Sequence, residues 1–143
     1  MSLSTILFVD DEIGFVETMS KRLTKRDFTI IPAHSGEEAL EQLEKHRGIE
    51  VVLLDVKMPG MDGIETLGKI KSKYPLAEVI MLTGHATVES AIDGMKLGAF
   101  DYLMKPCDMD QLVGKVTEAA SKKKRHEDKI IEARMKEITS RRP

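Results

Sequence analysis

The sequence is poor in aromatic residues and nearly devoid of cysteine. It contains no Trp, two Tyr and four Phe among its 143 residues, too few to favour a platform that stacks flavin or single-stranded nucleic acid. Its single cysteine, Cys107, has no partner for an internal disulfide and no neighbouring His or Cys that would activate it. We therefore expect an inert thiol, a reducing compartment and a cytoplasmic location.

The sequence also lacks a long apolar run and an excess charge of either sign. No stretch of about 18 apolar residues predicts a membrane-spanning helix, and the first residues show no basic leader. Lys and Arg total 22 against 24 Asp and Glu, so the net charge is −2. This balance predicts neither direct nucleic-acid binding nor an anionic membrane partner. The four His do not have the spacing of zinc ligands.

The chain instead alternates short apolar runs with amphipathic segments. The runs cover residues 6–9, 28–31, 51–54, 79–82 and 100–104, and helical spacing covers 13–23, 39–43, 64–70, 88–95 and 112–120. Three runs are almost continuously apolar, which is typical of parallel strands buried on both faces. Ser35 and Glu38 have capping-box spacing, and Gly98 marks a helix end. The pattern predicts one α/β sandwich with a mostly parallel sheet.

The nine methionines are interpreted mainly as flexible core residues. Met19, Met81 and Met95 fall on apolar positions of the predicted elements, so we expect them to be buried. Met58 and Met61 flank the Pro-Gly turn, and we expect them to be exposed.

Polar residues follow four of the predicted strands. Asp10, Asp11 and Glu12 follow the first, Asp55 the third, Thr83 and Gly84 the fourth, and Lys105 and Pro106 the fifth. The carboxyl ends of parallel strands meet at one sheet edge, where such folds bind their ligands. Three carboxylates gathered there repel one another unless a cation neutralises them. Oxygen ligands at an open rim suit Mg²⁺.

The same residues suit phosphoryl transfer. Asp55 stands alone at its strand end and can act as a covalent phosphoryl acceptor, Lys105 offers a mobile charge and Thr83 a hydroxyl. Each feature alone has a plainer explanation: acids that cap a helix, a loop carboxylate, a strand-end turn, a solvated lysine. Their joint placement at one sheet edge favours the site.

Four motifs, FVDDE, LLDVKMPGMDG, MLTGHA and GAFDYLMKP, occur in this order. With them the sequence resembles the receiver domain of bacterial two-component response regulators over about residues 4 to 122. The resemblance implies a flavodoxin-like (βα)5 fold with strand order 2-1-3-4-5. The segment from MLTGHA to the final Lys-Pro is most similar to receivers of nitrogen-regulation-type transcriptional activators.

The resemblance also implies residue roles. Asp55 would be the phosphoacceptor, and Mg²⁺, or Mn²⁺ in its place, would be held by Asp55, by Asp11 directly, by Asp10 mostly through water and by the main-chain carbonyl of Lys57. The remaining roles are phosphoryl sensing by Thr83 and Lys105, an aromatic switch at Tyr102, support from Gly84 and from Pro106 after a cis peptide bond, and control of the hydrolysis rate by Lys57 and His85.

The implied function is signalling rather than conventional catalysis. A histidine kinase or phosphotransfer protein would phosphorylate Asp55, and the chain would catalyse only its own phosphorylation and dephosphorylation. The phosphoryl group would change the face formed by the fourth helix, fifth strand and fifth helix, and so control an output domain, most simply one that regulates transcription. Cys107 departs from the aromatic or aliphatic residue common after Lys-Pro, without touching a catalytic role.

The last residues differ in composition. We expect a receiver domain over 1–122 and a basic, amphipathic helical segment over 123–143, in which Ile130, Ile131, Met135 and Ile138 recur at helical spacing. This segment either extends the fifth helix into a homodimer or leads to a C-terminal output domain. Its basic run is interpreted as a solvated helix face rather than a nucleic-acid patch.

Three rival functions stay open. An aspartate-nucleophile phosphohydrolase would carry D-x-D after the first strand, where this chain has V-D-D-E. A nucleotide- or flavin-binding module would carry a Gly-rich phosphate loop, which the sequence lacks. A receiver-like scaffold that signals without phosphate would lack key residues, all of which are present.

Overall fold

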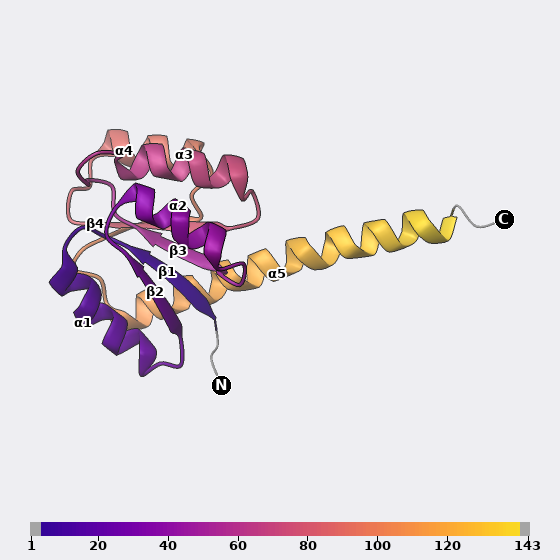
Figure 1. Cartoon of the computed structure of the whole chain (residues 1–143), viewed down its shortest axis with the longest axis horizontal. Coiled ribbons are helices and arrows are strands. Elements are labelled where there is room, and N and C mark those ends of the chain that lie inside the picture. Colours follow the sequence, from indigo (N-terminus) through magenta and orange to yellow (C-terminus); the bar gives the residue numbers. More distant parts are fainter. Residues whose placement is uncertain (1–3, 141–143) are drawn as a thin grey trace.

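The structure, a computed structural model, describes residues 4–140. Over this range five strands alternate with five helices (Figure 1). The elements are β1 (Thr5–Val9), α1 (Ile13–Thr24), β2 (Thr29–Ala33), α2 (Gly36–Lys45), β3 (Val51–Leu54), α3 (Gly63–Lys73), β4 (Glu78–Thr83), α4 (Val88–Lys96), β5 (Asp101–Met104) and α5 (Met109–Ser140).

The five strands form one parallel sheet in the order β2-β1-β3-β4-β5. This confirms the predicted flavodoxin-like fold. Every residue of β3 and β4 is buried, because helices cover both faces of these central strands. The register places Val9 beside Leu54 and Thr83 beside Met104, so the polar residues after these strands share one edge.

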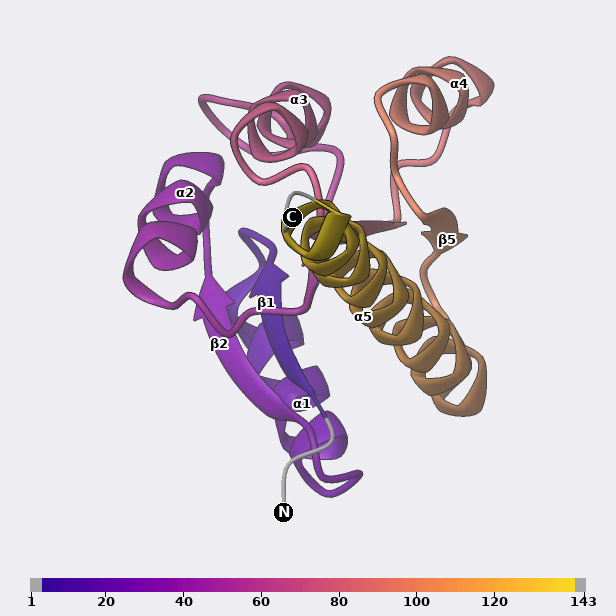
Figure 2. The same cartoon turned by 90° about the vertical axis from the view of Figure 1, so that its right-hand side faces the viewer.

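Two core layers lie on opposite faces of the sheet. α1 and α5 cover one face, and α2, α3 and α4 cover the other (Figure 2). Because side chains alternate along a strand, Ile6 and Phe8 of β1 enter the first layer and Leu7 and Val9 enter the second. Both layers consist largely of fully buried aliphatic side chains, which fixes the strand ends that carry the polar residues.

Local capping defines the helix ends. The Ser35 hydroxyl accepts from the Glu38 N–H at 3.0 Å, as predicted, while the Glu38 carboxylate accepts from the His34 N–H rather than completing a box at Ser35. α4 begins with a reciprocal capping box between Thr87 and Ser90. It ends before Gly98, whose φ of +100° suits the left-handed position after a helix and confirms that prediction.

Some burial predictions were wrong. Met19 and Met81 are buried, but Met95 is 48% exposed together with Ile92, and Val88 is 78% exposed. α4 buries only Gly94, whose bare backbone lies against Met81 and Tyr102, so the larger apolar side chains remain outside this contact.

The loop after β3 shows the opposite error. Met58 and Met61 were predicted to be exposed, but both are buried. Met61 packs against Gly36 at the start of α2, where a side chain would find little space. Met58 joins the core layer beneath α2 and α3. On α1, Ile13 is 56% exposed and the half-buried Phe15 packs on the core instead.

α5 is far longer than the other helices and extends away from the body of the molecule (Figure 1). Leu112, Val116 and Ala119 are buried against the sheet, whereas Ile130 to Ile138 present exposed apolar side chains. The helix runs without a break across residues 122 and 123, so the predicted domain boundary there stays a prediction. Residues 141–143 of the predicted segment lie outside the described residues. No described helix is long and apolar enough to cross a membrane.

We expect Gly63→Ala to destabilise the fold by about 1–3 kcal/mol, the usual cost of overpacking. A Cβ at Gly63 would overlap the Asp55 carbonyl oxygen and crowd the Val56 backbone. Urea unfolding would measure the loss. The matched control is Gly114→Ala, because a Cβ there meets nothing within 4 Å and should stabilise α5 by about 0.5–1 kcal/mol. Equal stability changes in the two variants would contradict the close approach at Gly63.

Candidate functional site

Three aspartates converge at the carboxyl edge of the sheet. Asp10 follows β1 and Asp55 follows β3, and the Asp55 N–H continues the ladder by donating to the Val9 carbonyl at 3.0 Å. One carboxylate oxygen from each of Asp10, Asp11 and Asp55 lies within 4.8 Å of the others. Asp10 and Asp55 are each 1% exposed, while Asp11 is exposed. The fold thus brings together the three carboxylates that sequence reasoning selected.

Asp55 is the least satisfied of the three. Both of its carboxylate oxygens are buried and have no hydrogen-bond partner within the described residues. Leaving a buried charged group unpaired is costly, so this carboxylate is suited to receive a cation or a phosphoryl group. The convergence of hard oxygen donors fits Mg²⁺ or Mn²⁺.

Lys105 directly follows β5, and its side chain reaches the acidic residues that follow β1. Its ammonium donates to Asp10 at 2.6 Å and to Glu12 at 3.2 Å. It also lies 4.1 Å from the centroid of the Phe15 ring, a cation–π contact. The Lys105–Pro106 peptide bond is cis, as the resemblance implied, and Gly84 lies beside the lysine stem.

Burial and charge act on the two partners differently. Burial raises the pKa of Asp10 above its ordinary value, although the hydrogen bonds from Lys105 and from the Glu12 N–H oppose this. Burial lowers the pKa of Lys105, but the hydrogen bond and charge of Asp10, followed by Asp55 and Glu12, outweigh it, so the net pKa is raised. Lys105 is therefore the internal countercharge of the cluster.

Lys57 and His85 lie at the entrance to the aspartate cluster, whereas Thr83 is buried. Thr83 is fully buried at the end of β4, and its hydroxyl accepts from the His85 N–H at 3.0 Å. Lys57 and His85 are exposed and, with Asp11, line a hollow of about 430 Å³ beside the cluster. The proposed metal contact of the Lys57 carbonyl stays a prediction.

Tyr102 lies apart from the aspartates. Its ring is half-buried in the layer beneath α4, and its hydroxyl is 2.6 Å from the Ser90 hydroxyl of α4. The sequence reasoning missed Ser90 and Phe15. Ser90 carried a signal, since it stands three residues after Thr87 in capping-box spacing. Phe15 carried none, because its contact with Lys105 depends on two elements far apart in sequence.

The model of the response regulator receiver domain family matches residues 6–117. The chain belongs to this family. The receiver domain is a signalling domain rather than a conventional enzyme, and the match spans β1 to the buried part of α5, including all three aspartates and Lys105.

The receiver is similar to parts of larger regulators. It is 41% identical to the transcriptional regulatory protein ZraR of Escherichia coli K12 over 107 residues, which is 75% of this chain and 24% of ZraR. It is 36% identical to the DNA-binding transcriptional regulator NtrC of the same strain over 121 residues, 85% of this chain and 26% of NtrC. The chain thus spans about a quarter of the length of these relatives, which are response regulators of the NtrC type.

Solved receiver structures share the fold. A receiver domain protein from Clostridium thermocellum matches with a TM-score of 0.81 at 36% identity, covering 85% of this chain and 98% of that one. CheY of Borrelia burgdorferi, solved in a complex with CheX, BeF3 and Mg²⁺, matches with a TM-score of 0.76 at 32% identity, covering 80% and 87%.

We expect Asp55→Asn to stabilise the protein by about 1–3 kcal/mol in the absence of divalent cations, because it removes one of two buried like charges that repel each other at short range. Urea unfolding in EDTA would measure the change. Asp11→Asn serves as control, since its exposed carboxylate is screened by solvent and should give a smaller change. A destabilised Asp55→Asn would mean that the buried aspartates do not repel each other as the geometry indicates.

Proposed function

We propose that this receiver domain accepts a phosphoryl group on Asp55 from a phosphohistidine of a sensor histidine kinase or phosphotransfer protein. The observation that carries the proposal is the buried Asp55 carboxylate, whose two oxygens have no hydrogen-bond partner within the described residues. It lies at the sheet edge with two further carboxylates. Its negative charge helps to raise the pKa of Lys105. A buried carboxylate in this state is free to attack.

A divalent cation fits the same edge. Asp10, Asp11 and Asp55, together with the Lys57 carbonyl, would hold Mg²⁺, with Mn²⁺ as the alternative. When bound, the ion supplies charge neutralisation for the acceptor and for the oxygens of the phosphoryl group. The similar CheY from Borrelia burgdorferi, whose complex contains Mg²⁺ and BeF3, supports this assignment.

The transfer asks the chain mainly for positioning. A carboxylate oxygen of Asp55 attacks phosphorus in line, the N–P bond of the phosphohistidine breaks, and the imidazole nitrogen keeps the electron pair. Lys105 exchanges its contact with Asp10 for a phosphoryl oxygen, and the Thr83 hydroxyl donates to another. In hydrolysis, water attacks phosphorus and the Asp55 carboxylate leaves. Lys57 and His85, at the entrance, control how readily that water arrives. The domain thus catalyses only its own phosphorylation and dephosphorylation.

The signal would leave through α4, β5 and α5. Drawing Thr83 toward the phosphoryl group frees space for Tyr102, whose hydroxyl is tied to Ser90 at the start of α4. A small difference in contacts suffices to shift a pre-existing equilibrium. Because ZraR and NtrC are named as transcriptional regulators, we propose control of transcription through an output domain, with a homodimer as the other route, and no direct nucleic-acid binding by residues 1–122.

We expect a single phosphoryl adduct on the wild-type chain after incubation with acetyl phosphate or phosphoramidate and Mg²⁺, and none on Asp55→Asn or in EDTA. Intact-mass spectrometry reads the adduct directly. Asp62→Asn is the matched control, since Asp62 is an exposed N-cap of α3 that Asn replaces well. Labelling of Asp55→Asn at the wild-type level would reject the acceptor, and a wild-type chain that binds Mg²⁺ but stays unlabelled would favour a phosphate-independent scaffold.

We expect Lys105→Ala to accept phosphate but to blunt the switch, because one phosphoryl oxygen loses its cation. Amide chemical shifts of α4 before and after phosphorylation would report the switch, and intact mass the extent of labelling. Lys69→Ala, at an exposed position of α3, should behave as wild type. Full α4 shifts in phosphorylated Lys105→Ala would make the lysine purely structural.

A further inference from the structure

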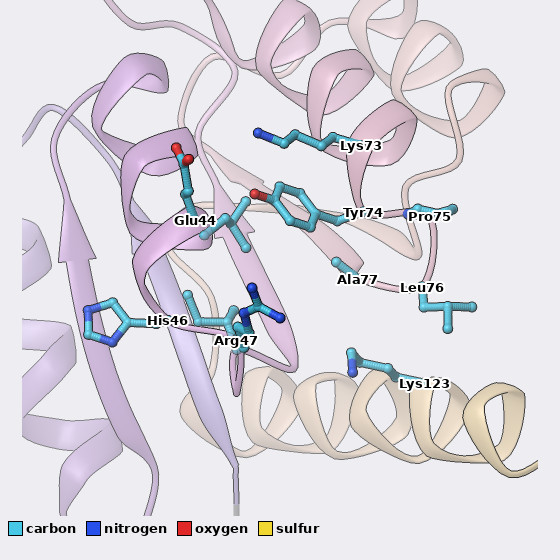
Figure 3. A pocket seen from close by; sticks show the side chains of 11 residues that line it. Glu44, His46, Arg47, Lys73, Tyr74, Pro75, Leu76, Ala77 and Lys123 are labelled. Atoms are coloured by element: carbon cyan, nitrogen blue, oxygen red, sulfur yellow. The ribbon is translucent and has the colours of Figure 1, made fainter. Parts of the chain in front are cut away.

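A second hollow, of about 570 Å³, lies at the opposite end of the sheet from the aspartates. Its walls come from the end of α2 and the loop to β3, from the end of α3 and the loop to β4, and from Lys123 of α5 (Figure 3). It therefore adjoins the amino ends of β3 and β4, whereas Asp55 and Thr83 stand at their carboxyl ends. Nothing in the proposed phosphoryl chemistry uses it.

The inner wall of this hollow is apolar. It includes the buried side chains of Leu43, Ile49 and Ala77 and the half-buried side chains of Tyr74 and Leu76. A concave volume between about 300 and 1,000 Å³ with an apolar lining and few polar groups is the usual form of a small-molecule site. The hollow is thus suited to the apolar body of one organic molecule rather than to an inorganic ion alone.

Basic side chains line the opening of this hollow. Figure 3 shows the guanidinium of Arg47 and the side chain of Lys123 approaching the hollow from different elements. Lys123 is paired with Glu127 at 2.9 Å, whereas no hydrogen bond or ion pair of Arg47 appears within the described residues. Lys73 lies at the other rim, its ammonium 5.6 Å from the Tyr74 ring centroid.

The basic side chains are only partly explained by helix ends. Lys73 stands in the last turn of α3, where a cation complements the helix dipole. Arg47 follows His46, the C-cap of α2, and so also lies close to a helix end, whereas Lys123 lies within α5 far from its end and pairs with Glu127 one turn further on. Two acids lie nearby: Glu44, near the end of α2, stands on the rim (Figure 3), and Glu127 contacts the Lys123 ammonium at 2.9 Å.

We propose that this hollow binds a small organic anion. Its apolar body would lie on Leu43, Ile49 and the Tyr74 ring. Its carboxylate, sulfonate or phosphate would lie between Arg47 and Lys123, where a charge-assisted hydrogen bond from the Arg47 fork gives orientation as well as affinity.

Such a ligand would join α5 to the loop before β3. The neighbouring Lys122 contacts the buried carboxylate of Glu78 at 3.4 Å, and the exposed part of α5 begins just beyond it. Occupancy would therefore fix the direction in which the α5 extension leaves the body, and give the molecule a second input that is independent of Asp55.

The test uses the full chain and the fluorescent anion 8-anilinonaphthalene-1-sulfonate. We expect saturable binding with one site per chain, and amide shift changes confined to residues 43–49, 73–77 and 120–125. Arg47→Glu should weaken binding about tenfold or more, the loss expected for a strong charge-assisted contact. Arg22→Glu, at an exposed position of α1, is the matched control and should bind as wild type.

Two further comparisons complete the test. N-phenyl-1-naphthylamine, the uncharged counterpart of the probe, should bind about tenfold more weakly if the cations select an anion, and equal affinity would overturn the choice of an anionic ligand. Asp55→Asn should bind the probe as wild type, which separates this site from the phosphoacceptor. Shift changes centred on α4, non-saturable binding, or equal affinities of Arg47→Glu and Arg22→Glu would overturn the site itself.

Discussion

The electrostatic repulsion among three aspartates at one sheet edge is the constraint on which the rest of the site depends. The parallel sheet forces Asp10 and Asp55 together, because the residues before them are register partners, and it buries both. The Lys105 ammonium partly neutralises the Asp10 carboxylate through a 2.6 Å contact. Contacts with Glu12 and with the Phe15 ring hold the lysine in this position. Asp55 has no hydrogen-bond partner among residues 4–140 and interacts with Lys105 only through its charge. An unpaired charge is tolerated there because the surrounding core is closely packed, and it makes this edge of the sheet suited to a cation.

The order of the strands and the edge of the sheet that carries the aspartates could be predicted from the sequence. Strands buried on both faces read as continuous apolar runs, as in Val51–Leu54, and the polar residue after each run marks the functional edge. Burial of individual side chains was less predictable, because it depends on partners distant in sequence. Met95 stands outside since α4 approaches the sheet through Gly94. Met58 is inside because its side chain joins the core layer that α2 and α3 cover. The contact between Lys105 and Phe15 likewise joins two elements that no local pattern relates.

Glu78 gives the far end of the sheet its own electrostatic organisation. This carboxylate, 2% exposed at the start of β4, attracts Lys71 of α3 at 3.8 Å and Lys122 of α5 at 3.4 Å. Lys71 also donates to the Pro75 and Ala77 carbonyls, so α3, β4 and α5 meet around one buried charge. Burial lowers the pKa of Lys71, although Glu78 opposes this. The long exposed part of α5 thus starts from a point held by charge as well as by the apolar contacts of Val116 and Ala119.

The two ends of the sheet are connected through the same rigid strands. β4 carries Thr83 at one end and Glu78 at the other, with every residue between them buried. A closely packed strand of this kind bends little, but it can shift as a unit between two discrete packing arrangements. The loosely packed neighbour is α4, which buries only Gly94 and is tied to β5 through Ser90 and Tyr102. A displacement of Thr83 would therefore be accommodated most easily by movement of α4. The point at which α5 leaves the body is fixed by Glu78 and adjoins the hollow at Arg47, so a ligand bound in that hollow would act on α5 instead.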